Sequence, residues 1–450
     1  MNRRILSLAL PNIITNITVP LLGMVDMAIV GHLSAAHIGA ITIGSSIFNL
    51  IYWNFGFLRM GTSGMTAQAY GAGNLDETTR LLVRAATVAL SIAAALLLLQ
   101  WPLSRLALLI FDGSPAVLSM AMTYFFVRIW AAPATLGLYA IKGWFIGLQN
   151  SRLPMWIAII LNVVNILCSL LFVLVFHWDI AGVALGTVIA QYSGLAIGLV
   201  FVRRTLRARN RHYDFGQLLR ESMRWNELRA FFKLNGDIFL RTLCLASVFT
   251  FITAASGRMS DEVLAIDALL LQFFTLFSYI MDGFAYAGES LVGRYIGARE
   301  PAQLRLSVRW LLVWGLLLTI VFTALYAIGG EYFLRLFSDD PAIVAGAGDY
   351  MFWTLVIPVC GFAAFLFDGI FVGATAGRTM RNTMFVATAV FFALYFGLKK
   401  VLLINDSLSI ERWNNVLWVA FMAYLAMRGL LQAARLRRDV YAKATPNVAE

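Results

Sequence analysis

Charged and chemically reactive side chains are scarce in this 450-residue chain, which has 13% charged residues, four histidines and three cysteines. Cys168, Cys244 and Cys360 all lie in apolar stretches without CxxC or Cys/His spacing, so neither a disulfide framework nor a metal site is expected. No GxxxxGK[ST] run is present, which argues against ATP hydrolysis by this polypeptide. The histidines fall in predicted loops without a carboxylate or nucleophile at catalytic spacing. We therefore expect no enzyme, no catalytic residue and no cofactor.

Apolar residues are abundant instead, at 60% of the chain, with a mean hydropathy of +0.78. A soluble core could not bury that much apolar surface, so the composition predicts an all-α polytopic membrane protein. Twelve segments have the length needed to span a bilayer. They lie near 5–31, 36–68, 81–109, 117–148, 154–176, 180–203, 230–256, 262–293, 304–328, 341–374, 382–404 and 412–434.

The basic residues give the expected orientation. Despite a net charge of +11, they gather in short loops on alternate sides of the segments, as a bilayer sorts charge, so nucleic acid is not an expected partner. The basic sides are predicted to be cytoplasmic, which places both termini inside the cell and the chain in the inner membrane. The main positions are Arg3, Arg4, Arg80, Arg84, Arg152, Arg203, Arg204, Arg207, Arg294, Arg299, Arg378, Arg381, Arg435, Arg437 and Arg438.

An internal repeat is the most informative pattern. A shift of 226 residues aligns Gly71 with Gly297, Gly143 with Gly369, Gly147 with Gly373 and Arg152 with Arg378 without a gap. Two parallel six-helix lobes around a central cleft follow, the architecture of alternating-access transporters driven by a gradient. We expect an N-terminal lobe at 1–203, a basic cytoplasmic linker at 204–229, a C-terminal lobe at 230–436 and a cytoplasmic tail at 437–450.

Ionisable residues inside the segments are the first functional candidates. Asp26 lies in the first segment, and a carboxylate there costs about 2.5–3.5 kcal/mol on insertion scales. Simple solvation near the outer mouth is the alternative reading. Asp282 and Asp368 are candidate cation or substrate contacts in the second half, and Asp267 is a weaker one. Asp237 and Arg241 have the i,i+4 spacing of a structural ion pair.

Four motifs recur in order along the chain: PLLGMVDMAIVGHL, LRMGTSGMTAQAYGAGN, MDGFAYAGESLVGRYIGARE and FDGIFVGATAGRTMRNTM. In these motifs the chain resembles the multidrug and toxic compound extrusion (MATE) family, most closely its DinF branch. The resemblance implies a twelve-helix, two-lobe efflux antiporter. Such a protein exports organic, cationic or amphipathic compounds in exchange for protons, or less favourably for sodium. Its partners would be small organic substrates and membrane lipids, and we expect a monomer.

The resemblance also implies roles for particular residues. Asp26 matches the cation-coupling aspartate of the first helix, and Asn165 matches an asparagine beside it. Ser169 stands where the family has a second aspartate, which would raise the proton affinity of Asp26 or complete a sodium site. Lys142 stands where a neutral residue is expected. We hypothesise that Asp26 alternates between protonation and pairing with Lys142 or Asn165, although Lys142 could instead snorkel to an interface.

Further residues are assigned to the pocket and to helix bending. By the resemblance Tyr124, Asn165 and Thr187 line the substrate pocket, whereas Asn162 and Gln191 also suit hydrogen bonds between membrane helices. Pro11 matches the family's bending proline, and Pro20 is a second expected bend. One alternative stays open, a lipid-linked or organic-anion flippase or exporter of the same superfamily, because the positive charge of Lys142 would favour anions.

Overall fold

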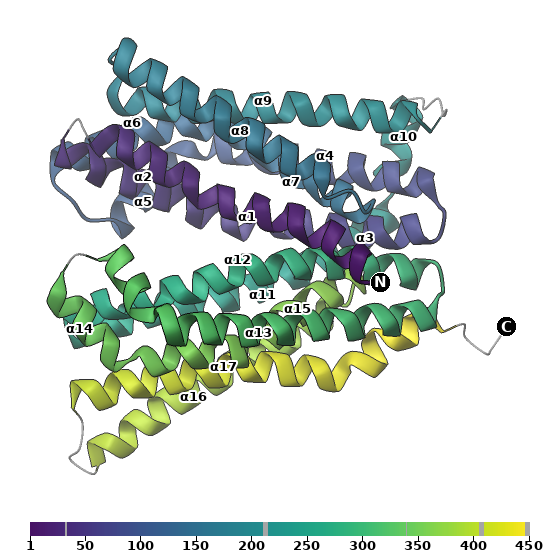
Figure 1. Ribbon diagram of the computed structural model, residues 1–450. Coiled ribbons are helices and arrows are strands. Elements are labelled where there is room, and N and C mark those ends of the chain that lie inside the picture. The colour runs from purple at the N-terminus through teal and green to yellow at the C-terminus, as the bar shows by residue number, and fades with distance from the viewer. Residues whose placement is uncertain (32–33, 210–214, 339, 405–408, 446–450) are drawn as a thin grey trace. The chain divides into compact units, whose positions relative to one another are not determined.

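The computed structural model describes residues 1–31, 34–209, 215–338, 340–404 and 409–445, and all regular structure in these ranges is helical (Figure 1). Within them, 12 helices are long and apolar enough to cross a membrane. This confirms the predicted all-α polytopic fold. The predicted linker and tail each include residues, 210–214 and 446–450, that lie outside the described ranges.

The helices form two compact units, Leu10–Asn235 and Gly236–Glu450 with Met1–Ala9. The division falls inside two continuous helices, α1 (Asn2–Gly31) and α11 (Trp225–Met259). The first nine residues therefore pack with the second unit, whereas the sequence placed them in the N-terminal lobe. One reason is a hydrogen bond from Arg4 Nη1 to the Tyr295 hydroxyl at 3.1 Å.

The N-terminal unit is a helix bundle whose helices run roughly along one direction (Figure 1). Its core contains Phe48, which stacks on Phe125 with ring centroids 5.5 Å apart. Its further helices are α2 (Ala35–Asn54), α3 (Phe57–Gly71), α4 (Leu75–Leu98), α5 (Gln100–Ile110), α6 (Pro115–Arg128), α7 (Ala132–Gly147), α8 (Arg152–Leu170), α9 (Asp179–Arg207) and α10 (Phe215–Ser222).

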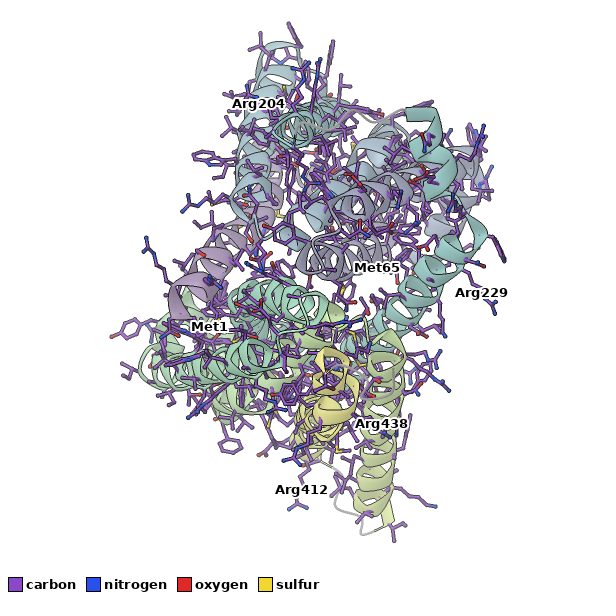
Figure 2. The ribbon with its side chains drawn as sticks, turned by 90° about the vertical axis from the view of Figure 1, so that its right-hand side faces the viewer. Met1, Met65, Arg204, Arg229, Arg412 and Arg438 are labelled. Atoms are coloured by element: carbon purple, nitrogen blue, oxygen red, sulfur yellow. The ribbon has the colours of Figure 1, made fainter. Side chains whose placement is uncertain are left out.

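The C-terminal unit is a second bundle, which carries both ends of the described chain; Figure 2 labels Met1 and Arg438 on it. In its core Tyr326 donates to the Phe273 carbonyl at 2.7 Å and packs edge-on against the Phe273 ring. Its helices after α11 are α12 (Asp261–Gly297), α13 (Pro301–Phe337), α14 (Pro341–Asp349), α15 (Met351–Gly373), α16 (Gly377–Ile404) and α17 (Ile410–Asp439).

Some predicted segments are interrupted where proline follows. The segment predicted at 81–109 is two helices, because Pro102 cannot supply the amide that would bond to the Leu98 carbonyl, and α4 ends at Leu98. A 3₁₀ turn over Ile129–Ala131 separates α6 from α7 just before Pro133, for the same reason. The segment predicted at 341–374 is divided at Tyr350 into α14 and α15.

Helix contacts confirm the internal repeat. A Cβ at Gly143 in α7 would collide with the Arg59 carbonyl oxygen of α3, and a Cβ at Gly369 in α15 would collide with the Ala285 carbonyl oxygen of α12. Both members of the second pair follow those of the first by 226 residues. The repeat therefore extends to the points where two helix backbones touch, which only glycine permits.

Turn geometry repeats with the same spacing. Gln149 and Thr375, which follow α7 and α15, have φ of 61° and 48°. Gly73 and Arg299, which follow α3 and α12, have φ of 71° and 55°. Left-handed backbone is uncommon for residues other than glycine. Its recurrence at matching positions shows that the two halves share one local fold.

Candidate functional site

Asp26 lies on the buried side of α1, with 6% of its surface exposed. The Ser169 hydroxyl of α8 donates to Asp26 Oδ1 at 3.3 Å. Helix α9 packs closely against this serine because residue 186 is glycine, whose Cβ position would lie 2.7 Å from Ser169 Oγ. Ser169, which stands where the resemblance leads us to expect a second aspartate, is therefore a direct partner of Asp26.

Arg128 adds a positive charge to this site. It is near enough for its charge to act on Asp26, and its Nη1 donates to the Tyr124 hydroxyl. The guanidinium carbon also lies 4.9 Å from the centroid of the Phe48 ring, in cation–π geometry. The sequence analysis did not identify Arg128. An arginine in the middle of a spanning segment is as costly to bury as an aspartate, and it is a functional candidate for the same reason as Asp26.

The asparagines and Thr187 occupy the helices beside Asp26. Asn165 is buried and donates to Thr187 Oγ1 at 3.0 Å, while its Oδ1 has no partner among the described residues. Asn162 donates to the Thr18 carbonyl of α1 at 3.0 Å. Gln191 on α9 is half-buried. Asn162 therefore ties α8 to α1, and Asn165 retains a buried acceptor.

The structure does not form the predicted pair between Asp26 and Lys142. Lys142 is half-buried in α7, and the charge that acts on it is that of Arg59. Asp26 is about 7 Å from the Gly31 end of α1 and Lys142 is about 7 Å from the Gly147 end of α7, at 1.5 Å per residue. Since the first and fourth spans end on opposite membrane sides, the two charges lie at different depths. Nor does Asn165 bond to Asp26; its amide donates to Thr187 Oγ1.

The α1 helix is continuous through both of its prolines. Pro11 is buried, and its carbonyl accepts from Thr15 Oγ1 at 2.9 Å. Next to it, Asn12 donates to Ser151 Oγ at 3.0 Å, which fixes this turn of α1 to the start of α8. Bending at Pro11 or Pro20 stays a prediction about other conformations.

Asp368 is the centre of a charged cluster in the C-terminal unit. Arg241 of α11 and Arg428 of α17 both donate to its Oδ2, Arg428 at 2.6 Å, and Gln432 donates to its Oδ1 at 3.0 Å. All four side chains are buried. Two guanidinium groups thus share one carboxylate, so a cation would have to displace an arginine to reach Asp368.

The predicted pair of Asp237 with Arg241 is wrong. Asp237 accepts from Arg381 of α16 at 2.7 Å, while Arg241 turns to Asp368. Contacts between helices therefore replace the i,i+4 pair, and each of the two aspartates is paired with an arginine of another helix. Asp282 on α12 is half-buried, and its charge acts on Arg428.

Asp267 was ranked as the weaker candidate, yet among the described aspartates of this unit it is the most completely buried, with 1% exposed. Its donors are Ser256, Asn414 at 3.0 Å and Trp418 at 2.8 Å. They come from α11 and α17, so the carboxylate joins three helices. No basic side chain of the described chain forms an ion pair with it.

Taken by units, the chemistry is asymmetric. The N-terminal unit offers one buried carboxylate whose partners are a hydroxyl and a nearby guanidinium, which suits reversible protonation. The C-terminal unit offers Asp368, which two arginines already neutralise, and Asp267, which is held by neutral donors. Arg128, Arg428 and Gln432 were not singled out from the sequence, and Arg241 was considered there only for its spacing to Asp237.

Comparison with known proteins agrees with this architecture. The family model MatE matches residues 11–171 and 238–396, two blocks that begin almost one repeat length apart. The chain is 38% identical over 432 residues to DNA damage-inducible protein F of Escherichia coli, covering 96% of this chain and 91% of that protein. It is 24% identical to the probable multidrug resistance protein NorM of Geobacillus kaustophilus, covering 97% and 94%.

Solved structures show the same fold. A crystal structure of a MATE protein in the bent conformation superposes with a TM-score of 0.83 at 16% sequence identity, covering 99% of this chain and 97% of that one. At this identity the likeness concerns the arrangement of helices.

Proposed function

The chain belongs to the MATE family of multidrug and toxin efflux transporters, and from this premise we propose that it exports organic cationic or amphipathic compounds in exchange for protons. The exchange would proceed by alternating access, in which a site opens to one membrane side at a time. The single observation that carries the proposal is the buried Asp26 carboxylate with Ser169 as its hydrogen-bond donor.

We propose proton exchange rather than sodium exchange because the groups around Asp26 suit a proton better than a metal cation. Ser169 contributes one neutral oxygen where a second carboxylate would bind sodium more strongly, and the charge of Arg128 repels a metal cation. A proton needs only the carboxylate itself. Protonation would cancel the attraction between Asp26 and Arg128, which gives the site two electrostatic states.

Competition between a proton and a substrate links the two fluxes. A cationic group of the substrate would be attracted to ionised Asp26 and lose that attraction once the carboxylate is protonated. Tyr124, Asn165 and Thr187 are the polar groups we assign to the same substrate site. The buried Oδ1 of Asn165 is an acceptor that a donor group of the substrate would satisfy.

We also propose that the protein lies in the cytoplasmic membrane with both termini in the cytoplasm, acting as a monomer without a cofactor. The distribution of arginines supports this orientation. The even number of candidate spans among the described residues, 12, supports placing both ends of the chain on the same side.

Transport in liposomes tests the proposal. Purified protein would export a fluorescent organic cation under an imposed proton gradient, with a sodium gradient as the comparison. Asp26→Asn should abolish the proton-driven flux, whereas Asp112→Asn, which changes an exposed loop carboxylate, should leave it intact. Equal flux in Asp26→Asn and the parent protein would refute the coupling role.

Export of organic anions is a second candidate, and one observation favours it. Arg241 and Arg428 share the single carboxylate of Asp368, and the Nε atoms of both have no partner among the described residues. Such a pair suits a carboxylate or sulfonate. The same liposomes loaded with an anionic dye distinguish the two candidates, since an anion exporter would move this dye and leave the cationic one.

A further inference from the structure

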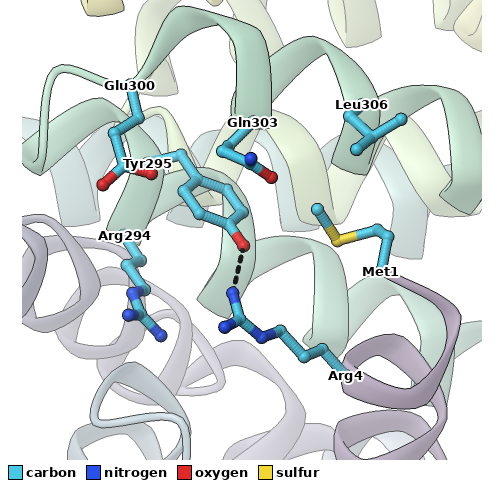
Figure 3. Close-up of a pocket in the computed structure, with 7 residues that line it drawn as sticks. All are labelled: Met1, Arg4, Arg294, Tyr295, Glu300, Gln303 and Leu306. Carbon is cyan, nitrogen blue, oxygen red and sulfur yellow. Dashed lines mark hydrogen bonds between the residues drawn. The ribbon is translucent and has the colours of Figure 1, made fainter.

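A pocket opens in the C-terminal unit where α1 begins and α12 passes into α13 (Figure 3). It has a volume of about 590 Å³ and is lined by Arg4, Arg294, Tyr295, Glu300, Gln303 and Leu306. This volume is within the usual range of ligand pockets, roughly 300–1,000 Å³. None of these residues belongs to the sites around Asp26 or Asp368.

The polar groups of the pocket converge on one region. The Tyr295 side chain is buried, with 1% exposed, and its hydroxyl accepts from Arg4 Nη1 at 3.1 Å. The hydroxyl proton is therefore directed away from Arg4 and can be donated to a ligand oxygen. Figure 3 shows Arg4 and Arg294 with their guanidinium groups on the same side of the Tyr295 ring. Two guanidiniums and a hydroxyl donor form a set that suits phosphate.

The start of α13 adds to the same preference. Its N-cap residue, Glu300, makes no side-chain hydrogen bond to the first turn, and since Pro301 has no N–H, the amides left without a side-chain cap are those of Ala302 and Gln303. Uncapped amides at a helix N-terminus favour an anion. Gln303 on this turn supplies a further amide group. Glu300 opposes anion binding, because its negatively charged carboxylate also lines the pocket.

An apolar surface continues from the pocket along α13. Leu306 lines the pocket and is 39% exposed, and the exposed apolar side chains continue from it in helical spacing. They are Val313, Leu316, Leu317 and Ile320. A free phosphate would make no contact with this apolar surface, whereas the acyl chains of a lipid would cover it. Arg3, Arg299 and Arg305 are neighbours in sequence of the residues that line the pocket, and these basic stretches lie on the side that we propose faces the cytoplasm.

We propose that this pocket binds the phosphate headgroup of an acidic phospholipid, with the acyl chains along the exposed face of α13. Arg4 and Arg294 would hold the phosphate oxygens, and Tyr295 would donate its hydroxyl proton. Because Arg4 belongs to α1, the lipid would also fasten the first turns of that helix to the C-terminal unit. The proposal rests on the orientation proposed above, and it is independent of the substrate and of the coupling ion.

The test is lipid binding to the purified full-length chain in detergent. Phosphatidylglycerol would be titrated against phosphatidylcholine, with native mass spectrometry counting bound lipid and thermal unfolding reporting stabilisation. Arg4→Gln and Arg294→Gln should each weaken phosphatidylglycerol binding about tenfold, as expected for a charged hydrogen bond. Arg3→Gln is the matched control, since it removes the same charge from the neighbouring, exposed position outside the pocket.

Glu300→Gln gives a prediction of opposite sign. Removing this carboxylate should strengthen binding severalfold, because its repulsion of the phosphate is lost. A loss of folding cannot produce tighter binding, so this variant separates recognition from stability. If Arg3→Gln weakens binding as much as Arg4→Gln, the effect is general surface charge and the proposal fails. If inorganic phosphate or glycerol 3-phosphate competes as strongly as the whole lipid, the ligand is a soluble phosphate and the lipid assignment is overturned.

Discussion

Ser169 donates a hydrogen bond to Asp26 across 3.3 Å, at the position where related proteins are expected to have a second carboxylate. We predict that Ser169→Asp shifts the pH of half-maximal transport upward by on the order of one unit, because two adjacent carboxylates do not both ionise readily. Ser169→Ala should give a smaller upward shift, since it removes only the donor. Proton-driven dye transport measured from pH 5 to 9 tests both, and an unchanged profile in Ser169→Asp would show that this contact does not tune the coupling site.

Arg128 should also affect the pH dependence of transport, through its positive charge. Arg128→Gln removes the positive charge near Asp26, so the ionised carboxylate is less favoured and the profile should move to higher pH. Arg128→Lys keeps the charge and should keep most of the profile, although it loses the planar group that contacts Phe48. If both variants shift the profile equally, the effect comes from packing rather than from charge.

The cluster around Asp368 should matter most for stability. Asp368→Asn would leave Arg241 and Arg428 buried without a counter-charge, a change that typically costs about 3–5 kcal/mol. Glu331→Gln breaks the exposed Glu331–Arg335 pair and should cost less than about 1 kcal/mol. Thermal unfolding in detergent compares the two, and a similar loss in both variants would contradict the view that the buried cluster holds α11, α15 and α17 together.

A pH effect is expected outside the membrane at Glu221 of α10. Hydrogen bonds from Gln217 and from Arg80, with the charges of Arg80 and Arg224, lower the pKa of Glu221 below its usual value. A lowered pKa in the folded state means that the carboxylate stabilises the fold at neutral pH and loses this contribution as the pH falls below about 4.5. Since the side chain is only partly buried and faces solvent, the effect should be small. The difference in melting temperature between the parent protein and Glu221→Gln should therefore shrink between pH 7 and pH 3, and a constant difference would contradict the assignment.

Much of the fold could be predicted from the sequence because a bilayer constrains it so strongly. The long apolar runs predicted the twelve spans, and the internal repeat at an interval of 226 residues predicted the two halves. The interruptions at Pro102 and Pro133 were missed because the apolar run continues through them while the backbone bond pattern does not.

The site was less accessible to sequence reasoning. Hydropathy selects the residues that are costly in a membrane, and it identified Asp26 and Asp368, but it does not give the rotation of a helix. The partners of these carboxylates depend on rotation and depth. The hypothesised pairing of Lys142 with Asp26 is therefore not formed in this structure, and Arg241, whose spacing suits Asp237, pairs with Asp368. The repeat did align Gly143 with Gly369, and both lie where two helix backbones touch.

Those glycines support a final prediction. Gly143 and Gly369 each face a backbone carbonyl that cannot move aside, so Gly143→Ala and Gly369→Ala should each destabilise the protein by about 1–3 kcal/mol through overpacking. Gly397 in α16 has nothing within 4 Å of its Cβ position, so Gly397→Ala should be neutral or stabilise by up to about 1 kcal/mol through helix propensity. Melting temperatures of the three variants give the comparison. Because the two repeat positions make the same contact in different units, they should respond alike. A loss at Gly143 with none at Gly369 would mean that the repeat has kept its backbone geometry in the second half without depending on it for stability.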